Sequence, residues 1–330
     1  MSEGDNDTFG GGSMRVSLII AAYNEGFNVR RTIEACGRAG FASLGGEILV
    51  IDDGSTDGIT TDLGDLGDLD RLVRVERLET RVGVASARDQ GARRARGETL
   101  IFVDAHCQPE PRALARLVDG VEAWEGKAIV TPALAVLEPS TWQTDHQALT
   151  HGSTVDLDSW TRRWADLGQM TPRPRPPLGC YYESPALAGC ALAVARATYE
   201  RIGGFDRAMR GWGSEDLDFA LRAWLLGFAI LHDPEAIVAH CPGAGYAIEA
   251  TAAEVTGNTL RLARKLSDDP TWDAWLGRYR RRIPAADFEV GWEAFTAQAE
   301  SADQERASLA SQAPHDLHWW IDRFRPDRRC

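Results

Sequence analysis

The sequence predicts an α/β fold with a mostly parallel, twisted sheet flanked by helices and followed by a helical C-terminal extension. Up to residue 137, short apolar runs alternate with segments of helical spacing. Such runs are typical of strands that are buried on both faces. From about residue 247 strand patterns stop, and the remainder is helical in character. Ligands of such sheets bind beyond the carboxyl ends of the strands, so we examine the residues after each strand first.

The expected elements follow one another along the chain. Strands are predicted at residues 15–23, 47–51, 71–78, 99–103 and 128–137, and helices at 28–40, 85–96, 111–124 and 215–226. Residues 138–178 break the pattern with three tryptophans, two histidines and a proline-rich run. A long irregular stretch is often functional, so this segment is a candidate acceptor-binding loop or lid. A plain surface insertion is the alternative.

Composition restricts the class of function. The net charge of −13 argues against nucleic acid as a partner. The sequence has no apolar window of about 18 residues, so we expect no membrane span. Residues 1–13 are polar and glycine-rich and do not resemble a signal peptide. The six cysteines form no Cys-x-x-Cys pair, so we expect a cytoplasmic protein with reduced thiols.

Three segments are expected on this basis. A disordered tail would cover residues 1–13, a catalytic domain residues 14–246, and the helical extension residues 247–330.

Two common phosphate-binding motifs are absent from the sequence. No Gly-x-Gly-x-x-Gly follows the first strand and no Gly-Lys-Ser/Thr loop occurs, which argues against a dinucleotide oxidoreductase and a P-loop enzyme.

Acidic residues and histidines follow the predicted strands. Asp52 and Asp53 could accept hydrogen bonds from a nucleobase or a ribose, although a simple turn is the alternative. Asp104 and His106 are two residues apart, so in an extended segment they would face the same ion. His240, after another apolar run, is a third candidate ligand. A carboxylate and imidazoles together with diphosphate oxygens suit Mn²⁺, whereas a capped turn with packed histidines is the alternative.

A third cluster opens the predicted helix 215–226. Two carboxylates, Glu215 and Asp216, follow Trp212 and two glycines. Acidic residues gain about 0.3–1 kcal/mol in a first helical turn, so a structural role alone is possible. The glycines would allow close backbone approach, and the Trp212 ring could stack on a sugar.

Together these motifs resemble glycosyltransferases of the GT-A fold, family 2-like, over about residues 15–246. The segments at 81–88, 104–107, 188–190, 203–206 and 212–215 resemble the polypeptide N-acetylgalactosaminyltransferases. The Trp-Gly-x-Glu-Asp form at 212–216 resembles the inverting β-galactosyltransferases and chondroitin-polymerase-type enzymes. The resemblance implies a hexosyl- or N-acetylhexosaminyltransferase that uses a UDP-sugar.

The resemblance also implies residue roles. Mn²⁺, or alternatively Mg²⁺, would be held by Asp104, His106 and His240. The nucleotide would be bound by Ala21, Tyr23, Glu25, Asp52, Asp53 and Arg81. The donor sugar would be bound by Ala188, Gly189 and Trp212, and the catalytic residues would be Asp216 and Glu215.

Asp216 bears on the stereochemistry. In the inverting branches the equivalent Asp is the general base, whereas the retaining N-acetylgalactosaminyltransferases have Asn there, so the resemblance implies inversion. A retaining transferase on the same fold and a catalytically silent sugar-nucleotide-binding protein are the alternatives. The acceptor could be a saccharide, a peptide, a lipid or another natural product.

Overall fold

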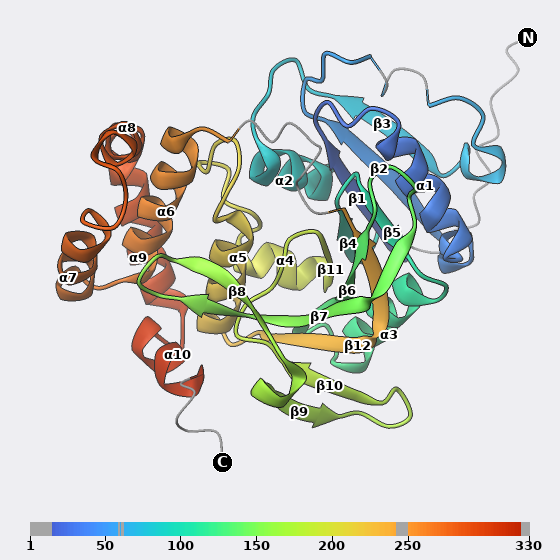
Figure 1. Cartoon of the computed structure of the whole chain (residues 1–330). Coiled ribbons are helices and arrows are strands. Elements are labelled where there is room, and N and C mark those ends of the chain that lie inside the picture. The colour runs from blue at the N-terminus through green and yellow to red at the C-terminus, as the bar shows by residue number, and fades with distance from the viewer. Residues whose placement is uncertain (1–14, 59, 61–62, 242–249, 325–330) are drawn as a thin grey trace, which may run out of the picture.

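The computed structural model describes residues 15–58, 60, 63–241 and 250–324. The expected tail at residues 1–13 and the expected boundary at 246/247 lie outside these residues. The predicted fold class is confirmed: a mixed sheet with a mostly parallel core is flanked by helices and followed by a set of C-terminal helices (Figure 1).

The sheet follows one path with three strands attached to its side. The path runs β3 (Val73–Arg77), β2 (Gly46–Asp52), β1 (Val16–Ala22), β4 (Thr99–Val103), β11 (Ala191–Ala195), β6 (Ala128–Leu137), β12 (Ala229–His240), β10 (Cys180–Glu183), β9 (Thr171–Pro174). Strands β1 to β4 pair in parallel, and β11 runs antiparallel between β4 and β6. The side strands are β5 (Cys107–Pro109) on β12, and the hairpin β7 (Thr144–Asp156) and β8 (Thr161–Ala165) on β6.

Helices cover both faces of the sheet, which explains why its central strands have no polar face. Alternate side chains of a strand point to opposite faces. Accordingly, Ile19 of β1 packs with one apolar cluster, while Leu18 and Ile20 pack with the other. The second cluster includes α1 (Asn28–Arg38) and α3 (Ala113–Ala123), and the first includes α2 (Val84–Arg94), α4 (Arg196–Ile202) and α5 (Glu215–Leu225).

The predicted helical extension is also confirmed. It comprises α6 (Ala252–Leu266), α7 (Asp269–Tyr279), α8 (Ala285–Thr296), α9 (Ala299–Gln312) and α10 (Leu317–Phe324). Three of its tryptophans, Trp272, Trp275 and Trp320, join the same buried cluster as α5, so the extension continues the core of the sheet domain. Within the described part of the chain, no helix combines the length and apolar character that a membrane crossing requires.

The expectation of an irregular segment at residues 138–178 is wrong. The long strand β7 and its partner β8 form a hairpin that reaches past the sheet toward the C-terminal helices (Figure 1). Its tip contacts α7, since the Trp275 indole donates a hydrogen bond to the Asp158 carbonyl at 3.2 Å. Most residues of β7 are half-buried or exposed without strict alternation. No hydrophobic pattern therefore marks this strand in the sequence; its pairing with β6 and β8 defines it.

Candidate active site

Three of the expected residues converge at the carboxyl-end edge of the sheet. Asp104 follows β4, His106 precedes β5, and His240 ends β12. The pairing of His240 with Cys107 across β12 and β5 brings the two histidines together. Their Nε2 atoms lie 3.2 Å apart, and Asp104 Oδ2 lies 3.7 Å from His240 Nε2.

The ligand atoms of these three residues all lie within 4.8 Å of one another. Two imidazole nitrogens and a carboxylate oxygen thus face a common point. This donor set fits a divalent cation such as Mn²⁺, and it leaves room in the coordination sphere for oxygens of a substrate.

Arg88, which the sequence interpretation left without a role, connects this cluster to α5. Its guanidinium lies 2.5 Å from Asp104 and 3.0 Å from Glu215, and the side chain is only 4% exposed. Burial alone would raise the pKa of Asp104, but the charge of Arg88 holds that pKa well below its usual range. Arg88 is the last residue of the 81–88 motif, so the signal for it was present in the sequence.

Glu215 has an unusual proton affinity. Burial, and then repulsion from Asp216, raise its pKa to about 7, although Arg88 acts in the opposite direction. One carboxylate oxygen also accepts a hydrogen bond from the Gly213 amide at 3.2 Å. Near neutral pH this carboxyl group can therefore either donate or accept a hydrogen bond.

Asp216 lies against the expected donor-sugar segment. Its carboxylate accepts hydrogen bonds from the amides of Gly189, at 3.3 Å, and Leu217, at 2.7 Å. Arg162 from β8 lies 3.6 Å from the same carboxylate oxygen that accepts the bond from Gly189. Trp212, four residues earlier, is 45% exposed and is thus free to meet a ligand.

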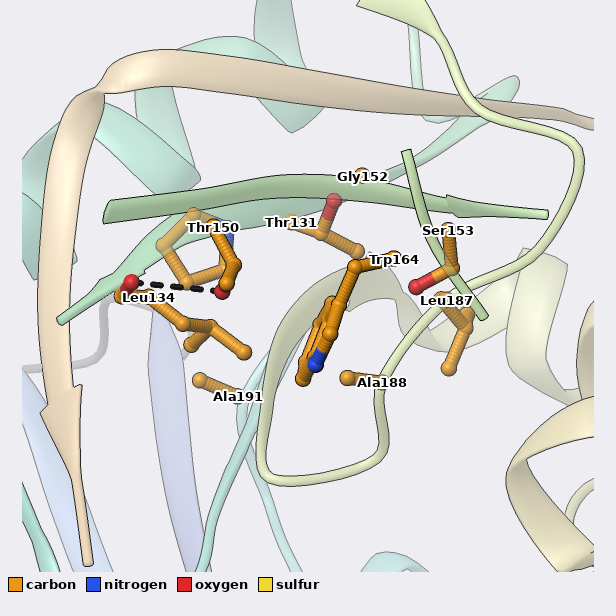
Figure 2. A pocket seen from close by; sticks show the side chains of 10 residues that line it. Thr131, Leu134, Thr150, Gly152, Ser153, Trp164, Leu187, Ala188 and Ala191 are labelled. Atoms are coloured by element: carbon orange, nitrogen blue, oxygen red, sulfur yellow. Dashed lines mark hydrogen bonds between the residues drawn. The ribbon is translucent and has the colours of Figure 1, made fainter. Parts of the chain in front are cut away.

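The β7–β8 hairpin forms one wall of a pocket beside this segment. Figure 2 shows the Trp164 ring extending from β8 into the pocket, where it lies between Ala188 and Ala191 in this view. The Arg162 guanidinium stacks on the Trp164 ring at 4.1 Å from its centroid. The hairpin thus places an aromatic ring next to Ala188, one of the three expected donor-sugar residues, and a cation next to Asp216.

The expected nucleotide-binding residues divide into two groups. Arg81 stacks on Tyr23 at 4.5 Å, and Asp53 accepts hydrogen bonds from the amides that follow Arg81, those of Val82 and Gly83. These residues therefore lie close to one another near the end of β1, where Ala21 is half-buried.

Asp52 and Glu25 have other partners. The Asp52 carboxylate is fully buried, accepts a hydrogen bond from the Ser55 amide, and pairs with Arg77 at 2.5 Å, so it stabilises the turn after β2. Both carboxylate oxygens of Glu25 lie 3.1 Å from His106 Nδ1. The structure therefore places Glu25 next to His106, one of the three expected metal ligands.

Comparison with protein families assigns the chain. The model of glycosyl transferase family 2 matches residues 17–201, more than half of the chain. The chain belongs to glycosyl transferase family 2. A second model, described as the N-terminal domain of galactosyltransferase, matches residues 173–239.

Curated proteins that are similar in sequence to this chain include N-acetylgalactosaminyltransferases. The probable N-acetylgalactosaminyltransferase 9 of Caenorhabditis elegans is 32% identical over 202 residues, which are 58% of this chain and 34% of the relative. Polypeptide N-acetylgalactosaminyltransferase 12 of Mus musculus is 29% identical over 325 residues, which are 95% of this chain and 52% of the relative. The chain thus spans between a third and about half of the length of these relatives.

Solved structures support the GT-A fold. The crystal structure of GalNAc-T7 with UDP, GalNAc and Mn²⁺ aligns with a TM-score of 0.73 at 21% identity, over 95% of this chain and 57% of that chain. A mannosyltransferase from Pyrobaculum calidifontis in complex with GDP-Man and Mn²⁺ aligns with a TM-score of 0.53 at 19% identity, over 94% of this chain and 84% of that chain.

Proposed function

We propose that this protein transfers a sugar from a UDP-sugar to an acceptor nucleophile with inversion at the anomeric carbon, in a Mn²⁺-dependent reaction. The convergence of Asp104, His106 and His240 on one point at the ligand-binding edge of the sheet carries this proposal. N-acetylgalactosamine is the first donor sugar to test, because the relatives are named for its transfer.

The chain's own residues would orient the donor. Tyr23, Asp53 and Arg81 would contact the uridine, and the turn at Ala188 and Gly189 would bind the sugar. Bound Mn²⁺ would supply Lewis-acid stabilisation of the negative charge that develops on the departing diphosphate. Asp104, His106 and His240 would hold it.

Asp216 would act as the general base. Its carboxylate takes the proton of the acceptor hydroxyl while that oxygen attacks the anomeric carbon and the bond to UDP breaks. The amide of Gly189 orients Asp216 toward the sugar turn. Glu215, with its pKa near 7, would exchange a hydrogen bond with a sugar hydroxyl, and Trp212 would cover the sugar ring.

A retaining reaction is the second candidate, because the curated relatives are N-acetylgalactosaminyltransferases. The family resemblance described above implies that the polypeptide enzymes of this name retain the anomeric configuration. The relatives' names also make a peptide the first acceptor to test, with saccharides and other natural products after it. The anomeric configuration of the product distinguishes the two stereochemical outcomes.

The test is UDP release from a panel of UDP-sugars with Mn²⁺, for the wild type, Asp104→Ala and Asp216→Asn. Glu34→Gln is the matched control, because Glu34 pairs with Arg30 one turn away on α1. We expect slow hydrolysis of one donor that disappears in Asp104→Ala and in EDTA. With a peptide acceptor, nuclear magnetic resonance of the product should show a β-linkage. Absence of both UDP release and nucleotide binding would refute the transferase proposal, and an α-linkage would refute inversion.

A further inference from the structure

A carboxylate from the first loop contacts an expected metal ligand on the side away from the metal site. Glu25 follows β1, and both of its oxygens lie 3.1 Å from Nδ1 of His106. The other ring nitrogen of His106, Nε2, faces His240 at 3.2 Å. The side chains of Glu25 and His106 are 13% and 10% exposed, so little water competes for the contact between them.

The backbone of the loop is built to aim Glu25 inward. Its two neighbours, Asn24 and Gly26, both have positive φ angles, of 53° and 54°. A left-handed conformation at two positions around one residue is uncommon and costs conformational energy, particularly at Asn24. The arrangement persists because neighbouring groups fix it.

Hydrogen bonds to the turn after β2 supply that fixation. The Asn24 amide donates to the Ser55 hydroxyl at 3.0 Å, and the Gly26 amide donates to the Asp57 carboxylate at 2.9 Å. The Asn24 side chain accepts a hydrogen bond from the Thr56 amide at 2.7 Å. Both residues beside Glu25 are therefore anchored, while the Glu25 carboxylate itself points at His106.

This geometry determines which nitrogen of His106 carries the proton. An ionised carboxylate only accepts hydrogen bonds, so the Nδ1 atom that it contacts must be the donor. In the neutral imidazole the lone pair is then on Nε2, the atom that faces Asp104 and His240. Carboxylate partners of this kind orient metal-binding histidines in many proteins.

We propose that Glu25 is a positioning residue for the metal site and does not bind the nucleotide. It fixes the His106 ring and its Nδ1–H tautomer, so that Nε2 is directed at the ion. This inference rests on the proposed metal site, and it replaces the nucleotide-binding role that the family resemblance implied for Glu25.

The experiment separates metal affinity from nucleotide affinity. Mn²⁺ binding is titrated by electron paramagnetic resonance at saturating UDP, and UDP binding is titrated by calorimetry in EDTA. For Glu25→Ala we expect Mn²⁺ affinity to fall by about 10–100-fold, with UDP affinity in EDTA unchanged. Glu25→Gln keeps a hydrogen-bond acceptor, so its Mn²⁺ affinity should fall less. Glu34→Gln should bind Mn²⁺ as the wild type does.

A tautomer measurement excludes a purely structural effect. In the metal-free wild type, the ¹⁵N chemical shifts of His106 should show a protonated Nδ1, and Glu25→Ala should shift the population toward a protonated Nε2. Unchanged Mn²⁺ affinity and unchanged shifts in Glu25→Ala would overturn the inference, as would weaker UDP binding in EDTA. Asp104→Ala, measured in parallel, separates failure of the Glu25 inference from failure of the proposed metal site. If this variant too leaves Mn²⁺ affinity unchanged, the metal site itself is refuted.

Discussion

Helix α5 carries carboxylates into two different environments, a donor-site cluster and an interface network. The donor-site cluster consists of Arg88, Asp104, Glu215 and Asp216, beside His106 and His240. The interface network consists of Asp206, Asp218, Arg222, Arg261, Lys265 and Glu305, and it joins α5 to α6 and α9. Both are largely buried, yet their charge balance differs.

In the interface network every carboxylate meets cations at close range. Lys265 lies 2.5 Å from Asp206, 2.7 Å from Asp218 and 3.0 Å from Glu305. Arg222 pairs with Asp218 at 2.6 Å, and Arg261 with Asp206 at 2.7 Å. Three carboxylates thus face three cations, and the network is electrostatically complete.

In the donor-site cluster negative charge exceeds positive charge. Asp104 and Glu215 share the buried guanidinium of Arg88, while Asp216 pairs with the more distant Arg162. The surplus appears in Glu215, whose pKa rises to about 7 mainly through burial and then through Asp216. Burial of charge therefore does not by itself identify a functional site; the cluster with surplus negative charge is the one that we propose binds a cation and a substrate.

The largest expected effect comes from removing an expected metal ligand beside the donor-site cluster. His240→Ala should reduce Mn²⁺-dependent UDP release on the order of a thousandfold, because a metal ion contributes several kcal/mol of charge stabilisation. His240 is 26% exposed, so the free energy of unfolding should change by less than about 0.5 kcal/mol. Turnover and urea unfolding, measured on the same preparation, test both statements. Activity within tenfold of the wild type would show that His240 is not a ligand.

A substitution in the interface network should lower stability and leave Mn²⁺ binding unchanged, the reverse of what we expect for His240→Ala. Lys265→Met removes a cation shared by three carboxylates, and unpaired buried charge typically costs about 3–5 kcal/mol. Urea denaturation at neutral pH measures this loss, while Mn²⁺ affinity of the folded variant should match the wild type. Lys127→Met is the control, because Lys127 and its partner Glu125 are largely exposed and such pairs contribute at most about 1 kcal/mol. Equal losses in the two variants would contradict the distinction between the regions.

The two regions should also respond to pH in opposite directions. Glu215 has a folded-state pKa raised by burial and by Asp216, so its contribution to stability is present below its ordinary value near 4.5 and is lost as pH rises toward about 7. Lys265 and Arg261 hold the pKa of Asp206 well below its usual range despite burial, so stability from the network is lost as pH falls below about 4.

Glu215→Gln isolates the first of these effects. In metal-free protein, the wild type should lose on the order of 3 kcal/mol between pH 4.5 and pH 7.5 relative to the variant, at about 1.4 kcal/mol per pKa unit. Chemical denaturation at a series of pH values gives the two profiles. Parallel profiles over this range would mean that Arg88 fully compensates Glu215 and that the donor-site cluster carries no surplus charge.

Local patterns in the sequence predicted the parts of the molecule that local rules determine. Apolar runs marked β4 and β6 at their observed limits, and the carboxylate and histidine after β4 marked the candidate metal site. The hairpin β7–β8 had no such pattern, because its residues are half-exposed and its register depends on β6. Tertiary pairing therefore determines what local patterning left undefined.

The same limit applies to individual side chains. The contact of Glu25 with His106 joins residues that are 81 positions apart, and Arg88 reaches Glu215 across 127 positions. Composition and spacing give the chemical type of each residue but not its partner. Asn258 of α6 had no signal at all in the sequence, although it contacts the turn that carries Trp212.

Asn258→Ala tests whether the C-terminal helices shape the active site, with the smallest expected effect. The buried amide of Asn258 donates to the carbonyls of Arg210, at 2.8 Å, and Gly213, at 3.1 Å, and accepts from the Arg210 amide. Its loss should cost about 1–3 kcal/mol of stability, because backbone groups are left without partners. Since these bonds hold the turn around Trp212, KM for the UDP-sugar should rise severalfold while affinity for UDP alone stays the same. A loss of stability with unchanged KM would show that α6 contributes to stability alone. A raised KM for the UDP-sugar with unchanged affinity for UDP would make the helical extension part of the sugar-binding site.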